Sequence, residues 1–449
     1  MARAVRSTAA VRAPPPPIAY VHTVSPVRPT VEVVGRALDS EHYRLRDFLT
    51  RIAQPFEWFE AGTARAEELL VSHDLAGAEL PIVIEGDVVR TGVTVRSLAD
   101  AWHLSSRPSR EVYDLVIVGA GPAGLGAAVY AASDGLSTLV IEADVPGGQA
   151  SYTSLIENFF GLVEGIGGAE LARRAGRQAE GFGAELLLLR GVVGSGSRDG
   201  KPLLRVEGGH EVSAEVVLAA TGMQWRRLEV EGVEELLDRG VYYGAGRSEA
   251  ARCGGDPVVV VGAGNSAGQA VLNLAAAGAR VTMAVRGDSL ADRMSAYLVE
   301  RIARHPLIDV RLRTQVTALD EKEGLLAAVE LTDAAGGRDR MPARALFLCI
   351  GGVPRTEWAG GVGVRVNDRG YVLTGTDLLV DGRRPDGWHL DRDPLPLETS
   401  VAGLFAAGDA RSGSTKRVAA AVGEGGTAVA LVHQRLEELR SYEAATRAP

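Results

Sequence analysis

Apolar and polar positions after residue 30 alternate between short strand-like runs and stretches with helical spacing. The expected elements are a strand at 31–34, a helix around Leu45 to Ile52, a strand at 56–59, a helix at 64–72, strands at 80–84 and 88–90, and a helix through Leu98 and Ala101. The turn at Glu85-Gly86-Asp87 separates the last two strands. This β-α-β-α-β-β-α order predicts a small compact domain over residues 31–104.

Further along the chain, a largely apolar strand twice runs into a glycine-rich segment and then a helix of small residues. The strand at 112–118 leads into Gly119, Gly121 and Gly124, and the strand at 258–261 leads into Gly262, Gly264, Asn265, Ser266 and Ala267. In this G-x-G-x-x-G/A layout the first small residue permits a tight turn, the second admits a pyrophosphate and the third lets the helix pack on the strand. Because the helix N-terminus also attracts negative charge, we expect a dinucleotide at each fingerprint.

Two acidic residues add to this prediction. Glu142 lies 18 positions after Gly124, at the end of an expected strand at 138–141, where it can accept hydrogen bonds from ribose hydroxyls. Asp409 ends a short strand near the C-terminus, although taken alone it equally suits a turn or a helix cap. Two sites imply two dinucleotides, and the natural pair is a flavin that stays bound and a nicotinamide that exchanges.

The composition is that of a soluble globular protein with several domains. The chain has 449 residues, of which 46% are hydrophobic and 23% charged, and this length allows about two to four domains. A formal charge of −9 argues against a nucleic acid partner. No apolar run reaches the roughly 20 residues that cross a bilayer, so no membrane partner is expected.

Cysteine and histidine usage limits the chemistry further. The two cysteines, Cys253 and Cys349, lie far apart, which excludes a disulfide scaffold and any Cys-x-x-Cys and fits a reducing, cytoplasmic compartment. We interpret Cys349 as a core residue and Cys253 as an ordinary packed residue, with a solitary reactive thiol as the alternative for Cys253. The eight histidines show no metal-ligand spacing, so no metal site is expected.

Two segments read as connections rather than domains. Residues 1–30 contain four arginines, no acidic residue and the proline run at 14–17, which predicts a flexible tail, with an organelle transit peptide as the alternative. Residues 105–111 are mostly polar and are broken by Pro108, as expected of a linker.

Seven motifs that occur in order between Tyr113 and Leu436 resemble those of low-molecular-weight thioredoxin reductases. Besides the two fingerprints, they are Gly147-Gly148-Gln149, Ile156-Glu157-Asn158, Ala220-Thr221-Gly222, Ile350-Gly351 and Ala407-Gly408-Asp409. The resemblance implies an α/β fold with two Rossmann-like domains, in which the NAD(P)H domain splits the FAD domain in sequence. It places the FAD domain at 112–226 and 355–449 and the NAD(P)H domain at 227–354, and it implies a homodimer.

The resemblance also implies, by position, which residues hold FAD and NADPH. The adenosine and pyrophosphate of FAD would contact Gly119, Gly121, Gly124 and Glu142, the isoalloxazine would lie near Gln149 and Asn158, and the ribityl chain would contact Asp409. A helix beginning after Lys416 would direct its N-terminus, at Arg417, Val418 and Ala419, toward the pyrimidine end of the flavin. The other expected cofactor contacts are Gly148, Thr221, Gly222, Gly262, Gly264, Asn265, Ser266, Ala267, Arg286, Gly351 and Gly408. Thr221, Gly222 and Gly351 are also the expected neighbours of a hinge between the two domains.

Two motifs of that family are incomplete in this chain. The family's Cys-x-x-Cys, which relays electrons from flavin to thioredoxin, is replaced by Ala245 and Ser248 in one register and by Gly244 and Arg247 in the other. Of the arginines that grip a 2′-phosphate, one remains in register, Arg286, and Arg293 comes two positions late. Arg286 favours NADPH, and NADH is the alternative donor.

The small domain at 31–104 resembles glutaredoxin and thioredoxin-like domains in layout, and a proline, Pro81, opens its third strand as in those domains, where it is cis. Where those domains carry their cysteines, this chain reads Asp39-Ser40-Glu41-His42-Tyr43. Thiol exchange needs a thiolate, so this domain is expected to be a docking or packing module.

Together these observations predict an FAD-dependent NAD(P)H oxidoreductase that transfers hydride to flavin N5 and then electrons to an external small-molecule or protein acceptor. No cysteine relay takes part. The alternatives are a ferredoxin-NADP reductase-like activity, and a redox-sensing flavoprotein or interaction module without turnover.

Overall fold

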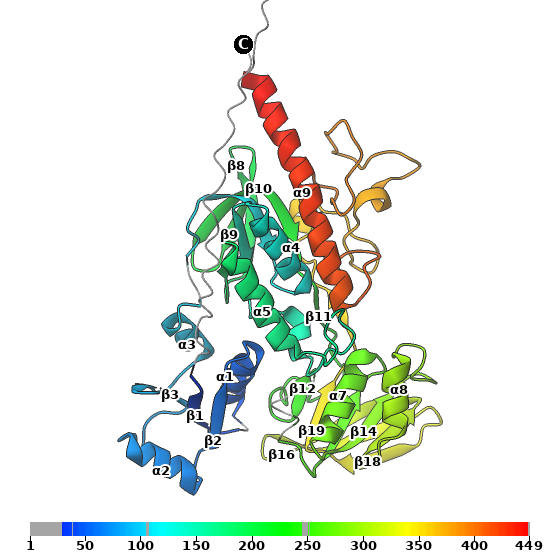
Figure 1. Ribbon diagram of the computed structural model, residues 1–449. Coiled ribbons are helices and arrows are strands. Elements are labelled where there is room, and N and C mark those ends of the chain that lie inside the picture. The colour runs from blue at the N-terminus through cyan, green and yellow to red at the C-terminus, as the bar shows by residue number, and fades with distance from the viewer. Residues whose placement is uncertain (1–28, 38, 105–106, 245–249, 251, 448–449) are drawn as a thin grey trace, which may run out of the picture.

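The computed structural model describes residues 29–37, 39–104, 107–244, 250 and 252–447. The expected tail up to residue 28, the first two linker positions, and Ala245, Arg247 and Ser248 lie outside the described residues. Figure 1 shows three α/β units. We call them the N-terminal unit (residues 31–104), the first Rossmann unit (112–226 and 355–447) and the second Rossmann unit (227–354).

The N-terminal unit is a four-stranded sheet with helices on both faces. Its elements are β1 (Val31–Gly35), α1 (Ser40–Arg51), β2 (Phe56–Glu60), α2 (Ala64–Ser72), β3 (Ile82–Glu85), β4 (Val88–Arg90) and α3 (Val95–Ala101). The strand order is β2-β1-β3-β4, with β1 parallel to β2 and antiparallel to β3. Alternate side chains of β1 bury both faces, because Val31 and Val33 pack with α1 and α3 while Val34 packs with α2.

The order of these elements is the predicted one, but two elements begin two or more residues away from the predicted start. α1 begins at Ser40 rather than near Leu45, because the Asp39 side chain accepts from the Glu41 and His42 backbone N–H groups and caps a turn with few apolar residues. β3 begins at Ile82, after the cis peptide Leu80-Pro81, since proline has no N–H for the ladder. The resemblance of this unit to thioredoxin-like domains stays a prediction.

The first Rossmann unit contains a seven-stranded sheet in the order β7-β6-β5-β10-β9-β8, with β21 beside β10. Its main elements are β5 (Val112–Val118), α4 (Pro122–Ser133), β6 (Thr138–Ile141), η1 (Gly148–Tyr152), α5 (Gly168–Gly181), β7 (Glu185–Leu187), β8 (Val192–Arg198), β9 (Lys201–Val206), β10 (His210–Ala219), η2 (Gly360–Val362), η3 (Gly375–Leu378), β21 (Leu404–Ala406), η4 (Gly408–Ala410) and α9 (Val418–Arg447). Alternation again fixes the layers: Leu115 and Ile117 of β5 pack with α4, α5 and α9, while Val116 packs with β9.

The C-terminal helix α9 closes this unit although it lies far from α4 in sequence. Figure 1 shows α9 running alongside α4. The helices approach closely at Gly425, where a Cβ would lie 2.1 Å from the Ala123 carbonyl oxygen. Although α9 has 30 residues, no helix in the described ranges combines the length and apolar character of a membrane span.

The second Rossmann unit has a parallel five-stranded sheet, β12-β19-β13-β14-β15, and an antiparallel sheet, β16-β17-β18. Its elements are β12 (Val241–Tyr243), β13 (Pro257–Val261), α7 (Asn265–Ala276), β14 (Arg280–Val285), α8 (Ala296–Ala303), β15 (Ile308–Leu312), β16 (Thr314–Lys322), β17 (Leu325–Asp333), β18 (Arg338–Pro342) and β19 (Ala345–Leu348). Both faces of β13 are buried, since Val258 and Val260 pack with α7 and α8 while Val259 packs with β17. This explains the unbroken run of valines.

The chain crosses between the Rossmann units through two short strands that pair with each other. β11 (Met223–Trp225) and β20 (Gly352–Pro354) form an antiparallel two-stranded sheet. Beside it, the Thr221 hydroxyl donates to the Arg355 carbonyl oxygen at 2.7 Å, and the Trp358 indole N–H donates to the same oxygen at 3.0 Å. β11 and β20 lie next to the predicted domain boundaries at 226/227 and 354/355, and these boundaries stay a prediction.

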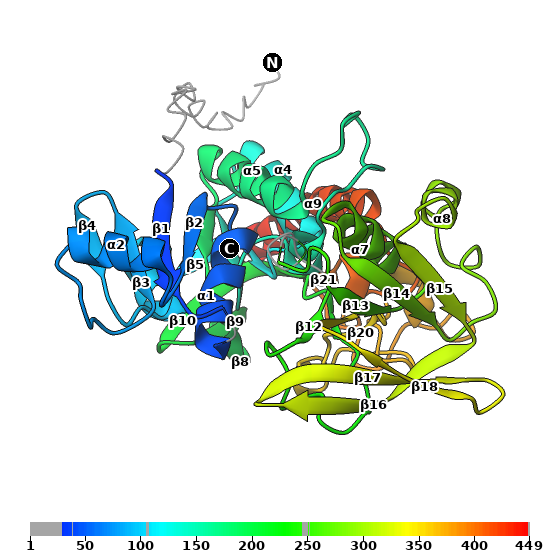
Figure 2. The ribbon, with the colours of Figure 1, turned by 90° about the horizontal axis from the view of Figure 1, so that it is seen from below.

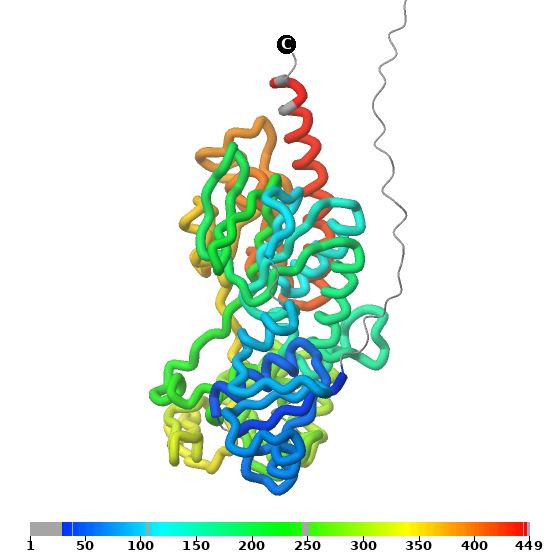
Figure 3. Tube along the Cα trace, turned by 90° about the vertical axis from the view of Figure 1, so that its left-hand side faces the viewer, coloured from blue at the N-terminus to red at the C-terminus, as the bar shows by residue number. Residues whose placement is uncertain are grey.

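Helix α1 lies between the two Rossmann units. Figures 2 and 3 show the N-terminal unit beside the second Rossmann unit and next to the first. Near its start, the Tyr43 ring lies 5.1 Å from the Tyr242 ring of β12, centroid to centroid. At its end, Arg51 pairs with Asp144 of the first Rossmann unit at 2.8 Å. The N-terminal unit therefore contacts both halves of the molecule through one helix.

Candidate dinucleotide-binding site

The glycines of the first fingerprint have three different environments. Gly119 has φ +107°, and a Cβ there would lie 2.3 Å from the Ala220 carbonyl oxygen at the end of β10. A Cβ on Gly124 would lie 1.9 Å from the Gly119 carbonyl oxygen. At Gly121, by contrast, no atom of the described residues lies within 4 Å of the Cβ position. The fold itself therefore requires Gly119 and Gly124, whereas Gly121 leaves space open at the N-terminus of α4.

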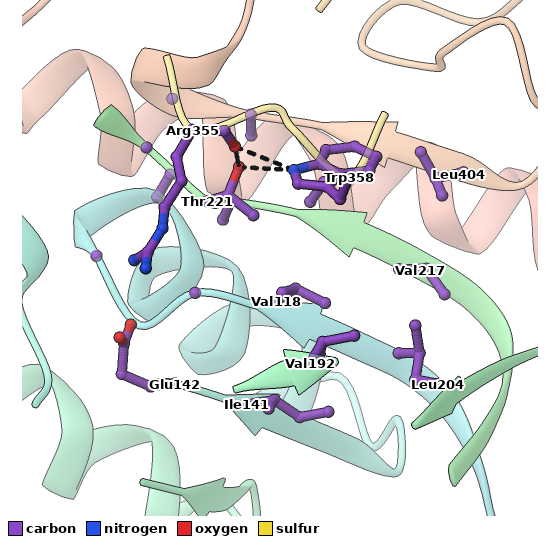
Figure 4. A pocket seen from close by; sticks show the side chains of 18 of the residues that line it. Val118, Ile141, Glu142, Val192, Leu204, Val217, Thr221, Arg355, Trp358 and Leu404 are labelled. Carbon is purple, nitrogen blue, oxygen red and sulfur yellow. Dashed lines mark hydrogen bonds between the residues drawn. The ribbon is translucent and has the colours of Figure 1, made fainter. Parts of the chain in front are cut away.

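Glu142 ties the end of β6 to this fingerprint. One carboxylate oxygen accepts from the Ala120 backbone N–H at 2.7 Å, and the other accepts from the Asp144 backbone N–H at 2.9 Å. Burial raises the pKa of Glu142, and these two hydrogen bonds only partly offset that rise. Figure 4 shows the Arg355 guanidinium pointing toward this carboxylate.

A cavity of about 1730 Å³ is lined by the first fingerprint and by strands of the adjoining sheet. Its apolar lining includes Val118, Ile141, Leu204 and Val217, which Figure 4 shows converging from neighbouring strands. Its polar lining includes Glu142, Arg355 and the backbone of the fingerprint. A long ligand with an anionic centre and flat apolar ends matches this division.

Gln149 lies at one end of the cavity, in the short helix η1. Its side-chain amide donates to the Met223 carbonyl oxygen of β11 at 3.1 Å, which holds it against the crossing strands. The Tyr152 ring at the end of η1 meets the Trp225 ring edge to face, with centroids 5.7 Å apart. Aromatic rings therefore form part of the cavity wall near Gln149, and a hydrogen bond orients the Gln149 amide.

The C-terminal segment also lines the cavity. Lys416 donates to the Asp409 carbonyl oxygen at 2.6 Å, and Glu424 accepts from the Gly408 backbone N–H at 2.7 Å. Burial raises the pKa of Asp409, with Lys416 partly offsetting the rise. Both Arg417 and Val418, at the N-terminus of α9, line the cavity.

The second fingerprint repeats the geometry of the first. Gly262 has φ +148°, and a Cβ there would lie 2.3 Å from the Cys349 carbonyl oxygen that follows β19. Around the Cβ position of Gly264, the described part of the chain has no atom within 4 Å. Ser266, at the start of α7, lines the same cavity as Gln149. Residues of both fingerprints thus line one cavity.

Twelve of the predicted cofactor residues line this cavity and nine do not. Those that line it are Gly119, Gly121, Glu142, Gly148, Gln149, Thr221, Gly222, Ser266, Gly408, Asp409, Arg417 and Val418. Those outside its lining are Gly124, Asn158, Gly262, Gly264, Asn265, Ala267, Arg286, Gly351 and Ala419. Asn265 is engaged elsewhere, because its amide donates to the Ser295 hydroxyl at 3.1 Å and its carbonyl accepts from the Ser295 N–H at 2.8 Å.

Both cysteines are buried. Cys349 follows β19 in the core of the second Rossmann unit, where burial raises the pKa of its thiol to about 12. Cys253 belongs to the same core. Of the described residues that line the cavity, none is a cysteine.

Several side chains at the cavity were not predicted from the sequence, among them Arg51, Asp144, Tyr152 and Arg355. Tyr152 and Arg355 follow predicted site residues within four positions, so proximity in sequence was a usable signal. Arg51 is 100 positions away from its partner Ser151 in the chain, and no local motif marks it.

The residues present fit an FAD molecule. The open Cβ position at Gly121 leaves the backbone N–H groups of the α4 N-terminus accessible to a pyrophosphate. Glu142 stands at the ribose position of a Rossmann unit, and the apolar strand ends next to it accept a flat ring.

Known proteins match most of this chain in sequence and in fold. The sequence profile of the family described as pyridine nucleotide-disulphide oxidoreductase matches residues 113–425. The thioredoxin reductase of Bacillus subtilis (strain 168) is 34% identical over 334 residues, which are 74% of this chain and 96% of that protein.

Two crystal structures share the fold. The T. acidophilum thioredoxin reductase has a TM-score of 0.64 at 26% identity, over 74% of this chain and 100% of that chain. The Lactococcus lactis thioredoxin reductase has a TM-score of 0.64 at 27% identity, over 73% of this chain and 99% of that chain. The chain therefore belongs to the pyridine nucleotide-disulphide oxidoreductase family, and it is a thioredoxin reductase-like, FAD-dependent NAD(P)H oxidoreductase.

Proposed function

We propose that the protein oxidises NADPH with bound FAD and passes the electrons directly to an external acceptor. The observation that carries this proposal is the shared cavity, which Gly119 and Gly121 of the first fingerprint and Ser266 of the second line together. Cofactors on the two units would face one space, where orientation alone brings reacting atoms together. When bound, FAD supplies the redox chemistry: it takes a hydride from NAD(P)H and gives up two electrons to the acceptor.

The chain's own residues would bind and orient the flavin. The α4 N-terminus and the open backbone at Gly121 would hold the pyrophosphate, and Glu142 would accept from the adenosine ribose. Gln149, fixed by the Met223 carbonyl oxygen, would contact the ring system. The N-terminus of α9 would stabilise negative charge near Arg417.

NADPH is the proposed donor. Arg286 is exposed directly after β14, the position in a Rossmann unit that reads the 2′ substituent of the adenosine ribose. A guanidinium there can pair with a 2′-phosphate, whereas the 2′-hydroxyl of NADH offers it only a neutral partner.

The proposed route to the acceptor uses no thiol. Nucleophilic relay chemistry needs a thiolate, but burial raises the pKa of the Cys349 thiol to about 12 and Cys253 is buried as well. A small molecule or a protein that takes electrons directly from flavin fits this route. A partner that depends on a Cys-x-x-Cys relay does not.

An anaerobic titration tests the first half of the proposal. Stoichiometric NADPH should bleach the visible absorption band of the flavin in the purified holoprotein. Adding ferricyanide or a quinone should then restore the band and sustain turnover. A flavin that stays oxidised under excess NADPH and NADH, or a protein that binds no FAD, would contradict the proposal.

A redox sensor without turnover is the second candidate, and one observation favours it. Arg51 of the N-terminal unit lines the cavity, so a small domain without known chemistry is in contact with the cofactor site. A sensor would be reduced by NADPH but would turn over artificial acceptors no faster than free flavin does. A ferredoxin acceptor is the third candidate, and rapid turnover with a ferredoxin would single it out.

We also propose a homodimer located in the cytoplasm, by analogy with the family. Light scattering coupled to gel filtration gives the mass of the particle directly, and a value close to the 47.2 kDa of one chain would contradict the dimer.

A further inference from the structure

The N-terminal unit lies outside the family match, which begins at residue 113. It nevertheless places one charged side chain at the cofactor cavity. Arg51, the last residue of α1, is only 6% exposed and lines the cavity together with Asp144 and Tyr152. A buried guanidinium is costly unless it is paired, so its contacts are informative.

Arg51 is paired with groups of the first Rossmann unit and of its own helix. Its Nε donates to the Ser151 hydroxyl at 3.0 Å, and its Nη1 lies 2.8 Å from an Asp144 carboxylate oxygen. The guanidinium carbon stands 4.2 Å above the centre of the Tyr152 ring, and Asp47 of α1 lies 3.5 Å from Nη1. Burial lowers the pKa of Arg51, but Tyr152, Asp144 and Asp47 outweigh it, so the pKa lies above its usual value and the charge persists.

One branch of these contacts reaches the turn that carries Gln149. The Ser151 hydroxyl, which accepts from Arg51, donates in turn to the Gly148 carbonyl oxygen at 2.7 Å. Gly148 adopts φ +51° at the start of η1, a conformation that glycine permits, and its carbonyl oxygen is held by the Ser151 hydroxyl. Arg51 thus fixes the hydroxyl that closes this turn.

The second branch reaches the first fingerprint. Asp144, held by Arg51, donates its backbone N–H to Glu142, and Glu142 accepts from the Ala120 N–H inside the fingerprint. The turn that carries Gln149 and the first fingerprint are therefore both connected, through hydrogen bonds and an ion pair, to the Arg51 side chain of the N-terminal unit.

We propose that Arg51 is a positioning residue of the FAD site: by bridging Asp144 and Ser151 it holds the 142–152 segment in the shape that accepts the cofactor. This proposal rests on the proposed function only in that the cavity binds FAD. The N-terminal unit has no cysteines and lies outside the family match, and the proposal gives it a role within the flavin site.

The test measures FAD affinity and the environment of the flavin rather than turnover. Apoprotein would be titrated with FAD, following the quenching of flavin fluorescence, and the visible circular dichroism of the bound flavin would be recorded. R51A should weaken FAD binding about 10- to 100-fold and change the dichroism, because a charge-assisted contact of this kind contributes on the order of 1.5–3 kcal/mol. R51K, which keeps the charge but not the planar fork, should recover part of the affinity.

The control comes from the same helix. Arg44 of α1 faces Asp238 of the second Rossmann unit, with Nε 3.7 Å from the carboxylate, so R44A perturbs α1 without touching the 142–152 segment. R44A should keep wild-type FAD affinity and dichroism. Equal losses in R44A and R51A would overturn the proposal, since they would show that any change in α1 has this effect.

A milder variant covers the case in which R51A does not fold. S151A removes only the hydroxyl between Arg51 and Gly148 and should weaken FAD binding about 3- to 10-fold. In the double variant, the loss should be smaller than the product of the single losses, because both changes break one chain of contacts. Wild-type affinity and dichroism in both R51A and S151A would overturn the proposal while leaving the FAD site intact. A wild-type protein that binds no FAD would overturn the proposed function as well.

Discussion

Glu142 and Arg286 occupy equivalent places in the two Rossmann units, each directly after the strand that follows the fingerprint helix. Glu142 follows β6, which ends at Ile141, and Arg286 follows β14, which ends at Val285. This position faces the adenosine ribose of a bound dinucleotide. A carboxylate there suits a free ribose hydroxyl, and a guanidinium there suits a 2′-phosphate, so we expect the two units to bind adenosines with different 2′ substituents.

The first prediction concerns coenzyme choice. R286A should raise the KM for NADPH about 10- to 100-fold and leave the KM for NADH almost unchanged, because it removes charge-assisted contacts to the 2′-phosphate alone. Steady-state kinetics with ferricyanide as acceptor provide the measurement. Arg280, exposed at the opposite end of the same strand, gives the matched control, and R280A should change neither value. Equal losses for both coenzymes in R286A would show that Arg286 does not read the phosphate.

The second prediction contrasts two glycines of one fingerprint. In G121V the new side chain enters open space in the cavity, so the protein should fold but bind less than about a tenth of the wild-type FAD. In G124V the side chain meets the Gly119 carbonyl oxygen, 1.9 Å from the Cβ position, so the fold itself should be damaged. The ratio of flavin to protein absorbance and the Tm of the apoproteins separate the two effects. A fully yellow G121V, or a G124V with wild-type Tm, would contradict this interpretation.

The third prediction follows from the raised pKa of Asp409. Burial is the main cause, with Lys416 opposing it and Glu424 adding to it. The folded protein therefore keeps a proton that the unfolded chain releases, so ionisation of Asp409 lowers the free energy of unfolding as the pH rises above 3.8. At neutral pH, D409N should raise the Tm of the apoprotein by about 1–3 °C, and the difference should shrink as the pH falls toward the unfolded value.

The same substitution should weaken FAD binding, because the carboxylate is proposed to contact the ribityl chain. Thermal unfolding of the apoprotein at several pH values and fluorescence titration with FAD give the two readouts. A D409N apoprotein with a lower Tm than the wild type and with unchanged FAD affinity would contradict both parts of the prediction.

The fourth prediction concerns the two cysteines. Ellman's reagent should find no fast-reacting thiol in the native protein and two after denaturation, since both thiols are buried and the pKa of Cys349 is about 12. The double variant C253A/C349A should keep at least about half of the NADPH-ferricyanide activity, allowing for a modest packing loss. Loss of turnover in a folded, flavin-loaded double variant would return a thiol to the mechanism.

The local features of the fold were accessible from the sequence because local chemistry determines them. The first fingerprint specifies its own strand, turn and helix: Gly119 adopts φ +107°, and Gly124 is required by a contact within the same β-α unit, with the Gly119 carbonyl oxygen. The run of valines at 258–261 likewise indicated a strand that is buried on both faces. Family membership followed from these motifs and is confirmed by the profile match at 113–425.

Features that depend on the arrangement of units were not accessible. Ser266 lines the same cavity as Gln149 only because the second Rossmann unit packs where it does, and no sequence pattern encodes that placement. Asn265 was expected at the coenzyme, but Ser295, 30 positions later, takes up both ends of its amide. The position of Arg51 at the cavity was even less predictable, because its partners Ser151 and Asp144 belong to another unit.

Helix α1 connects the two Rossmann units over a fixed distance. Its 12 residues span about 18 Å at the rise of an α-helix, and contacts near its two ends belong to different Rossmann units. Tyr43 rests on Tyr242 of the second unit, and Arg51 is anchored to Asp144 of the first. A rotation of one Rossmann unit against the other about β11 and β20 would break the contacts at one end of this helix. We therefore expect the relative orientation of the two Rossmann units to depend on how the N-terminal unit is docked.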